Sequence, residues 1–322
     1  MTKKLKVLVI RFSSIGDIVL TTPVLRCINN QLNVSIDFLT KDKYNSLLTS
    51  NTDIENLILL GNDTSQTIKT LRANRYDMII DLHNNLRSFR IRKELNTQSY
   101  VLSKYSLKRF VLIYFGIDLL KNHIVDRYFE TVKSIGVYND NKGIEYTLNP
   151  TTKIDFNIKQ DYIAWVIGGS YETKKLSQKQ IEDVILKLDI PVVLIGGTTE
   201  NEVADLIINN LFDKKIYNFC GIITLDQSAL LIRHSKLVLT NDTGMMHISS
   251  AFSNPIISFW GCTKPSLGFS PYMPKNKFEN LISKMSKKPC SKHGQCCSYL
   301  KDGCVKSISA EEIYSTIKKL LK

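Results

Sequence analysis

The sequence lacks a long apolar run. Nowhere in its 322 residues do apolar side chains continue for the roughly 20 positions that a helix needs to cross a bilayer. The first residues lead into a strand pattern without the cleavage site of a secretory signal. A disulfide framework is not indicated either, because the cysteine count of seven is odd and Cys27, Cys220 and Cys262 are scattered through core-like or loop-like segments. We therefore expect a cytoplasmic protein.

Acidic residues are outnumbered, but the basic excess is not concentrated anywhere. Lysine and arginine total 43 against 30 aspartate and glutamate, a net charge of +13, of which residues 1–150 contribute +7 and residues 151–322 contribute +6. Nucleic-acid binders usually gather charge on one face or arm, and no helix-turn-helix, zinc-finger or RNA-recognition signature is present. Anionic small molecules or a lipid surface are therefore expected as partners, and nucleic acid is not.

The dinucleotide fingerprint Gly-x-Gly-x-x-Gly is missing from the first strand-to-helix turn. That turn reads Arg-Phe-Ser-Ser-Ile-Gly-Asp (residues 11–17) and lies between a buried-strand pattern at 5–10 and a helical pattern at 18–29. Strand-like runs recur at 36–39, 57–60 and 78–82, and helix-like stretches at 43–48, 66–73, 104–116 and 123–136. The alternation predicts a parallel sheet covered by helices, with ligands at the carboxyl ends of the strands.

A polar segment at 138–160 reads as a linker and divides the chain into predicted domains 1–155 and 156–322. The second half repeats the alternation, with strands expected at 163–167, 191–195, 216–219 and 236–240 and helices at 178–188, 199–211, 225–234 and 310–321. No sequence repeat relates the halves. The predicted fold class is α/β, with two Rossmann-like domains facing across a cleft.

Three loops of the second half follow predicted strands: residues 168–175 (Gly-Gly-Ser-Tyr-Glu-Thr-Lys-Lys), 196–200 (Gly-Gly-Thr-Thr-Glu) and 241–247 (Asn-Asp-Thr-Gly-Met-Met-His). Each alone is explained as a turn or a helix cap. Together they offer lysine for phosphate, a carboxylate for ribose hydroxyls and a helix N-terminus for pyrophosphate. They predict a nucleotide-diphosphate site.

The first half offers one carboxylate, Asp17, at the N-terminus of a helix in a hydroxyl-rich loop. It either caps that helix or acts as a general base on an acceptor hydroxyl. Nearby positive charge would keep its pKa low, so it would act through position more than through proton affinity. The basic stretch at 86–93 is explained equally by a solvated helix face.

Residues 11–23 and 241–247 closely resemble motifs of the ADP-heptose:lipopolysaccharide heptosyltransferase family, inverting glycosyltransferases of the two-Rossmann GT-B type. Residues 81–88, 173–176 and 196–200 match further family landmarks in the same order. The resemblance implies transfer of heptose, or a related sugar, from an ADP-sugar to a lipopolysaccharide core or other saccharide acceptor. It makes residues 1–155 the acceptor-side domain and residues 156–322 the nucleotide-sugar domain.

The resemblance also implies roles for individual residues. Asp17 matches the catalytic base. The donor-binding positions are Ser170, Lys174, Glu200, Ile223, Asp242, Thr243, Gly244 and His247. Candidates for anionic groups of the acceptor are Arg87, Arg109 and Arg127. Lys174-Lys175-Leu176-Ser177 departs from the Trp-Pro that often follows the family's lysine, so Lys174 is preferred for phosphate and Lys175 stays open.

No metal or other cofactor is expected in the transfer, because such GT-B chemistry uses lysine and a helix dipole in place of Mg²⁺, and neither proposed loop contains Asp-x-Asp. The acceptor would be an anionic saccharide-lipid met at the cytoplasmic face of the inner membrane, through peripheral contact. Two other functions stay open: a GT-B enzyme that modifies the nucleotide sugar itself, such as a 2-epimerase, and a non-catalytic nucleotide-binding protein.

A cysteine cluster near the C-terminus is not explained by this function. Cys290, Cys296, Cys297 and Cys304 lie close together in sequence, with His293 among them. Four thiols and an imidazole are zinc ligands, although the spacing C-x5-C-C-x6-C is no standard finger. The alternative is a basic loop with free or oxidisable thiols.

Overall fold

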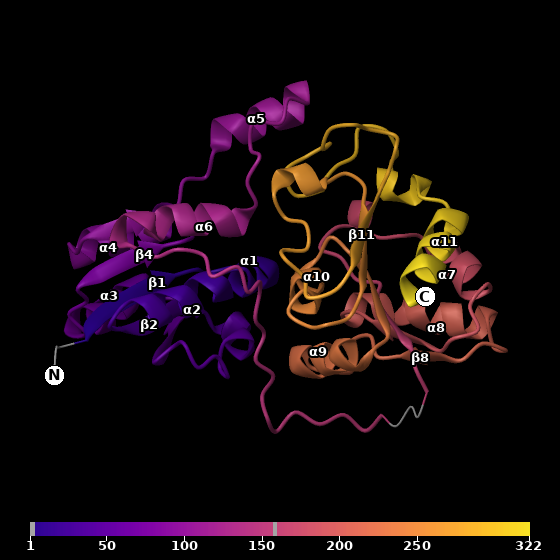
Figure 1. The fold of residues 1–322 in the computed structure, drawn as a ribbon, viewed down its shortest axis with the longest axis horizontal. Helices are drawn as coiled ribbons and strands as arrows, with labels where there is room; N and C mark the ends of the chain where they lie inside the picture. Colours follow the sequence, from indigo (N-terminus) through magenta and orange to yellow (C-terminus); the bar gives the residue numbers. More distant parts are fainter. Residues whose placement is uncertain (1–3, 157–159) are drawn as a thin grey trace. The chain divides into compact units, whose positions relative to one another are not determined.

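Two parallel sheets organise the chain (Figure 1). The computed structural model describes residues 4–156 and 160–322. Contacts divide the chain into one unit that runs to Tyr105 and resumes at 122–149, and a second unit of residues 106–121 and 150–322. The change of unit after Asn149 and the predicted boundary after residue 155 lie within the same polar segment.

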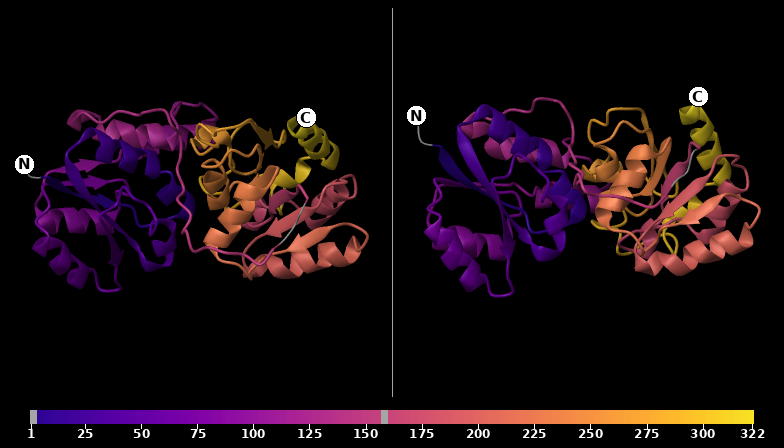
Figure 2. Two further views of the ribbon diagram at one scale, coloured as in Figure 1. Left: turned by 60° about the horizontal axis from the view of Figure 1, so that its bottom comes forward. Right: turned by 90° about the horizontal axis from the view of Figure 1, so that it is seen from below.

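The first sheet has the order β3-β2-β1-β4-β5, and all its strands are parallel. The strands are β1 (Leu5–Ile10), β2 (Val34–Lys41), β3 (Asn56–Leu60), β4 (Met78–Asp81) and β5 (Ser99–Val101). The four apolar residues of β1 from Val7 to Ile10 are fully buried, as expected for a central strand covered on both faces. Helices lie on both sides of the sheet (Figure 2).

The first unit contains α1 (Ile15–Val19), α2 (Thr22–Gln31), α3 (Thr64–Ala73), α4 (Leu86–Leu95) and α6 (Ile124–Val132), with short 3₁₀ turns η1 (Asp42–Leu47) and η2 (Lys133–Ile135). The single helix predicted at 18–29 is wrong. Pro23 lies in the first turn of α2 and cannot donate a hydrogen bond to the preceding turn, so the chain forms two helices instead of one.

The second sheet has the order β11-β10-β9-β6-β7-β8, again all parallel. Its strands are β6 (Ile163–Val166), β7 (Val192–Ile195), β8 (Ile216–Asn218), β9 (Leu237–Asn241), β10 (Ile256–Trp260) and β11 (Phe278–Ile282). The parallel α/β pattern predicted for this half is confirmed, and β10 and β11 extend it beyond the strands expected from the sequence.

The helices of the second unit are α5 (Ser106–Phe115), α7 (Gln178–Ile185), α8 (Asn201–Asn210), α9 (Leu225–His234), α10 (Gly244–Ser249) and α11 (Ala310–Leu321). Short 3₁₀ turns are η3 (Glu172–Lys174), η4 (Thr198–Glu200), η5 (Pro265–Leu267) and η6 (Cys304–Ser307). Lys288 joins α5 to this unit through a hydrogen bond from its Nζ to the carbonyl of Tyr114 (2.6 Å). Among the described residues, no helix has the length and apolar character to cross a membrane.

The strand order reverses once in each sheet, between β1 and β4 in the first and between β6 and β9 in the second. At such a switch point the loops that follow the two neighbouring strands leave toward opposite faces and open a crevice, where ligands of doubly wound sheets bind. In the first unit the crevice belongs to residues 11–17 and 81–85. In the second it belongs to residues 167–175 and 242–244.

Candidate functional site

An ion pair marks the switch point of the second sheet. Lys174 follows β6 and Asp242 follows β9, and Nζ of the lysine lies 2.7 Å from Oδ2 of the aspartate. The same oxygen accepts a hydrogen bond from the Thr263 hydroxyl (2.7 Å), which follows β10. Both members of the pair keep 12% of their side-chain surface exposed. A cation is therefore fixed at the position where ligands of this fold bind.

The side chain of Asn241 holds the two loops of this crevice together. Its Nδ2 donates to the carbonyls of Ile167 and Gly168, both at 3.0 Å, and thereby ties the end of β9 to the chain that leaves β6. This residue belongs to the motif at 241–247, but nothing in the linear pattern showed that it bridges two strands. Its position at the end of a fully buried strand was the available signal, because a buried amide must find partners.

Lys175 points to a different carboxylate. Its Nζ lies 3.1 Å from Oε1 of Glu200, and it also pairs with Glu172. Glu200 is only 5% exposed and also accepts hydrogen bonds from the backbone of Gly197 (2.8 Å) and the hydroxyl of Thr199 (3.0 Å). Three of roughly four acceptor positions of this carboxylate are thus occupied. The two lysines are neighbours in sequence but have separate partners.

Gly196 in the loop after β7 and Gly221 in the loop after β8 leave no room for side chains. A Cβ at Gly196 would lie 2.8 Å from the Cβ of Glu200 and 3.0 Å from the sulfur of Cys220. Gly221 has a φ of +73°, and a Cβ there would lie 2.6 Å from the Cα of Thr198. These close approaches bring the loop after β8, which carries the half-buried Ile223, against the segment that carries Glu200.

The other predicted donor residues lie on the same edge of the sheet. Ser170 is exposed in the loop after β6, and His247 is buried in α10. Thr243 occupies the N-cap of α10, just before Gly244, without forming a side-chain cap bond. Its buried hydroxyl has no hydrogen-bond partner among the described residues. A free hydroxyl next to a fixed cation is a ready contact for an anionic ligand.

In the first unit, Asp17 is held by two neighbours. Oδ1 lies 2.7 Å from Nη2 of Arg11, and Oδ2 accepts hydrogen bonds from the hydroxyl (2.9 Å) and the backbone N–H (3.2 Å) of Ser14. The contacts with Ser14 form a capping box at the start of α1, so the capping role considered for Asp17 is real. The side chain nevertheless remains 22% exposed.

The charge state of Asp17 follows from these contacts. Burial alone would raise the pKa of the carboxyl group, but the Arg11 guanidinium and the hydrogen bonds from Ser14 outweigh it and hold the pKa of Asp17 below its usual range. The expected low pKa is confirmed, and its main source is Arg11. The carboxylate is ionised at neutral pH.

Arg11 and His83 are two residues of this crevice to which the sequence gave no role. Arg11 follows β1, is buried, and donates to the carbonyls of Leu82 (2.5 Å) and Ser13 (2.8 Å). His83 follows β4 and packs against Phe12, with ring centroids 4.9 Å apart and the rings tilted by 55°. Burial and the charge of Arg11 lower the pKa of His83 to about 4, so the imidazole is neutral at pH 7. Arg11 lies in the motif at 11–23 and His83 in the segment at 81–88, and this was the available signal in the sequence.

The three arginines suggested for the acceptor have different surroundings. Arg87 is exposed in the first turn of α4. Arg109 is half-buried on α5, which belongs to the second unit. Arg127 is 1% exposed within α6, so an acceptor would reach its guanidinium only if the surrounding chain moved. Their acceptor role stays a prediction.

The cysteines gather differently from the sequence-based expectation. Cys290, Cys297 and Cys304 lie together as expected, but the fourth sulfur is that of Cys262, which follows β10. Cys296 is exposed and outside the group. Neighbouring residues in a chain often point in opposite directions, so adjacent Cys296 and Cys297 do not share one centre.

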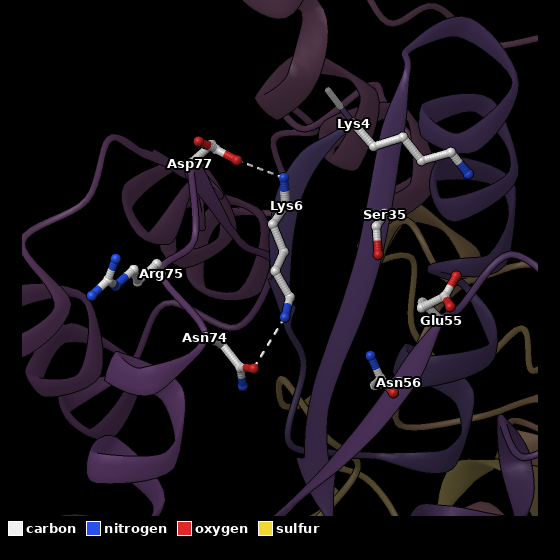
Figure 3. Close-up of a pocket in the computed structure, with 8 residues that line it drawn as sticks. All are labelled: Lys4, Lys6, Ser35, Glu55, Asn56, Asn74, Arg75 and Asp77. Carbon is white, nitrogen blue, oxygen red and sulfur yellow. Dashed lines mark hydrogen bonds between the residues drawn. The ribbon is translucent and has the colours of Figure 1, made fainter. Parts of the chain in front are cut away.

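A pocket of about 430 Å³ opens at the opposite edge of the first sheet (Figure 3). Its residues lie at the amino-terminal ends of the strands, among them Lys6 of β1, Ser35 of β2 and Asn56 of β3. The backbone N–H of Lys6 donates to Asp77 (2.7 Å), and its ammonium group donates to Asn74 (3.0 Å). Ligands of doubly wound sheets bind at the carboxyl ends, so this pocket is not the candidate site.

Comparison with known proteins agrees with the geometry. The family description Glycosyltransferase family 9 (heptosyltransferase) matches residues 65–299. The chain is 23% identical to lipopolysaccharide heptosyltransferase 1 of Campylobacter coli, over 98% of this chain and 99% of that protein.

Solved structures show the same fold. The glycosyl transferase family 9 protein from Veillonella parvula superposes with a TM-score of 0.81 at 20% identity and covers 100% of this chain and 98% of its own. The E. coli ADP-heptose lps heptosyltransferase II superposes with a TM-score of 0.74 at 18% identity, with 98% of each chain covered. The predicted fold class, α/β with two Rossmann-like domains of the GT-B type, is confirmed. Because the family match spans well over half of the chain, this protein belongs to glycosyltransferase family 9, the heptosyltransferases.

Proposed function

We propose that this glycosyltransferase moves heptose from ADP-heptose to the saccharide core of lipopolysaccharide, with inversion at the anomeric carbon. The observation that carries the proposal is the Lys174–Asp242 ion pair at the switch point of the second sheet. It fixes a cation where a doubly wound sheet binds its ligand, inside the two loops that match the family. The substrate class is that of the relatives, which are lipopolysaccharide heptosyltransferases.

The donor diphosphate is proposed to bind at Lys174, Thr243 and Gly244. The α10 helix has only six residues, so its dipole is small and the lysine supplies most of the positive charge. Asp242 pairs with that lysine in the free enzyme and would have to give it up, in part, to the phosphate when the donor binds, while it keeps its hydrogen bond from Thr263. Ser170 and His247 complete the proposed contacts on the diphosphate and sugar side.

The adenosine half is proposed to lie along Glu200 and Ile223. Glu200 has about one acceptor position left, which suits a ribose hydroxyl. Ile223 lies in the loop packed against that segment and offers an apolar surface to the adenine ring.

Asp17 is proposed as the general base. A hydroxyl oxygen of the acceptor attacks the anomeric carbon, its proton passes to the carboxylate, and the bond from that carbon to ADP breaks. A single displacement of this kind inverts the configuration. Since the pKa of Asp17 is depressed, the carboxylate contributes through orientation, and Arg11 and Ser14 fix its two oxygens. Lys174 offsets the charge that develops on the departing diphosphate, so no metal is assigned to the transfer.

Contact with an anionic membrane surface is proposed through α5. Large apolar side chains of this helix and the residues after it are exposed: Leu107, Phe110, Tyr114, Phe115, Ile117 and Leu119. Lys108 on the same helix and Lys121 shortly after it are exposed as well. A helix that shows both apolar and basic side chains to solvent suits the boundary between headgroups and acyl chains. The active site would then work at the cytoplasmic face of the inner membrane.

The decisive experiment measures ADP release from ADP-heptose with and without heptose-deficient lipopolysaccharide. We expect release that depends on the acceptor, and loss of turnover by on the order of 10²-fold or more in Asp17→Asn with donor affinity nearly unchanged. Asp77→Asn is the matched control, because this exposed aspartate of the same unit accepts one backbone hydrogen bond at the opposite edge of the sheet.

Three results would contradict the proposal. Release of nucleotide without acceptor would favour an enzyme that acts on the nucleotide sugar itself. Donor binding without any turnover would favour a binding protein. Normal turnover of Asp17→Asn would remove this carboxylate from the mechanism.

A further inference from the structure

Four thiols that are far apart in sequence meet in the second unit. The sulfurs of Cys262, Cys290, Cys297 and Cys304 all lie within 4.8 Å of one another. In the structure the Sγ–Sγ separations are 3.5 Å for Cys297–Cys304, 3.6 Å for Cys262–Cys304, 3.8 Å for Cys290–Cys304 and 4.0 Å for Cys290–Cys297. All four cysteines are free thiols.

These separations match one geometry. Four sulfurs placed about 2.3 Å from a central zinc at the corners of a tetrahedron are about 3.8 Å from one another. A disulfide would require a separation of about 2 Å in one pair and would leave the other two sulfurs outside it. Four of the six sulfur pairs lie 3.5–4.0 Å apart and all six lie within 4.8 Å, which is close to the arrangement of a tetrathiolate metal centre.

The backbone around the four thiols is organised for ligation. Cys290 donates its N–H to the carbonyl of Cys262 (2.8 Å), which joins the segment at 289–304 to the chain just after β10. The backbone N–H groups of Tyr299 (3.5 Å) and Leu300 (3.4 Å) point at the sulfur of Cys297. Hydrogen bonds to a ligand sulfur orient it and spread its negative charge.

The length of the irregular segment at 283–303 and the positive charge of Lys264 also favour a metal site. Residues 283–303 contain neither helix nor strand, and stretches of that length rarely hold one conformation without a staple. A zinc ion with four thiolates carries a net charge of −2, and Lys264, buried at 4% exposure, is fixed beside the cluster by a hydrogen bond to the carbonyl of Ser283 (2.8 Å).

We infer that Cys262, Cys290, Cys297 and Cys304 bind one zinc ion as a structural tetrathiolate site. On binding, the four thiols release four protons and the ion takes four sulfur ligands, without any change of oxidation state. A closed set of four protein ligands leaves no open coordination position, so the ion has no part in the sugar transfer.

The cysteine-bearing segment also packs against the loop after β6, which carries Thr173 and Lys174. Thr173 donates its hydroxyl to the carbonyl of Gly294, and a Cβ at Gly294 would lie 2.7 Å from the Cε of Lys174. A Cβ at Gly303 would lie 2.4 Å from the carbonyl oxygen of Thr173. On the other side, Thr263, next to Cys262, holds Asp242. Through these contacts the zinc site positions both members of the Lys174–Asp242 pair, a role that rests on the proposed function.

The first test is the metal content of protein purified without chelator, measured by mass spectrometry of the elements. We expect about one zinc per chain in the natural protein and in Cys296→Ser, and loss of zinc in Cys262→Ser and in Cys290→Ser. Cys296→Ser is the matched control, because this exposed thiol lies beside Cys297 but outside the cluster.

A second test needs no variant. A thiol-alkylating reagent applied to the native protein is expected to modify Cys296 without releasing zinc, while the four cluster thiols react only after a chelator has removed the ion. This measurement keeps the inference falsifiable if Cys262→Ser does not fold.

Several outcomes would overturn the inference. They are protein that contains no zinc and takes up none when it is added under reducing conditions, iron in place of zinc, disulfides among the four thiols, or loss of zinc in Cys296→Ser while Cys262→Ser retains it.

The positioning role has its own readout, the affinity for ADP. We expect Cys290→Ser, which lacks zinc, to bind ADP at least about 10-fold more weakly than Cys296→Ser. Equal affinity would overturn the positioning role and leave the zinc site intact. If the natural protein contained zinc but bound no ADP, the proposed function would fail and the metal site would stand.

Discussion

At the scale of single residues, two adjacent lysines form ion pairs with different carboxylates. Lys174 pairs with Asp242 inside the motif proposed for the diphosphate, and Lys175 pairs with Glu200, which is proposed to bind the ribose. We expect Lys174→Gln to lose roughly 1.5–3 kcal/mol of ADP binding, the usual value of a hydrogen bond to a charged group, and to lose most of its preference for ADP over AMP. Calorimetric titration with both nucleotides measures this.

Lys175→Gln is the matched control for that experiment. It removes the same charge one residue later, so it should weaken ADP and AMP binding by similar factors and keep the preference between them. If the two variants changed the ADP-to-AMP ratio equally, neither lysine would be assigned to the second phosphate.

The sequence predicted candidate residues of the site more readily than their partners. Asp17 and Lys174 could be chosen because they sit in dense motifs at the ends of strands. Their partners depend on which strands become neighbours. Asp242 lies 68 positions after Lys174, and the two meet because β6 and β9 are adjacent in the sheet. Cys262 replaces Cys296 for the same reason, since the end of β10 brings it to the cluster from 42 positions before Cys304.

At the scale of elements, apolar periodicity predicted every central strand except β10, and the edge strands β3 and β8, but it missed the edge strands β5 and β11. The residues of β1, β6, β7 and β9 are almost continuously apolar because helices cover both faces. At the edges, β5 has only three residues and β11 is half-exposed, so neither produces a strong pattern. The omission of β10 has no such reason, because Ile256–Trp260 is as buried as β9.

Arg26 of α2 forms ion pairs with two carboxylates, Asp140 and Glu145, of the segment that follows α6. Arg26 donates to both oxygens of Asp140, at 2.7 and 2.8 Å, and Nη1 lies 3.1 Å from Glu145. The hydrogen bonds from Arg26 lower the pKa of Asp140 to about 2. A depressed pKa in the folded state adds stability above the unfolded-state pKa, and this stability is lost as pH falls through about 2.

We therefore expect Asp140→Asn to destabilise the first unit by roughly 1–2 kcal/mol at pH 6, a value reduced for partial solvent screening. The difference from the natural protein should shrink below about pH 4 and vanish near pH 2, which urea unfolding at several pH values measures. Glu145→Gln is the comparison, because this partner of the same arginine is 43% exposed and should contribute less. If the difference in unfolding free energy between Asp140→Asn and the natural protein did not depend on pH, the Arg26–Asp140 contact would contribute packing alone.

At the scale of the whole molecule, charge and exposed apolar surface have different distributions. The excess of +13 is shared almost equally by the two halves of the chain, so it attracts anionic partners in general and selects no face. The apolar surface of α5 is local. A membrane contact should therefore combine a general, salt-sensitive attraction with a specific anchor.

The specific anchor is tested by sedimentation with lipid vesicles. We expect the natural protein to bind vesicles that contain anionic lipid, and Phe110→Ser and Phe115→Ser to bind them on the order of 10-fold more weakly each, because inserting a phenylalanine is worth roughly 1.5–3 kcal/mol. Phe212→Ser is the control, since Phe212 is 89% exposed on a loop away from α5. Raising salt to 1 M, where the Debye length is about 3 Å, should weaken binding of every variant by a similar factor. If Phe212→Ser lost as much binding as the α5 variants, the contact would be a general property of exposed apolar groups, and α5 would have no special part in it.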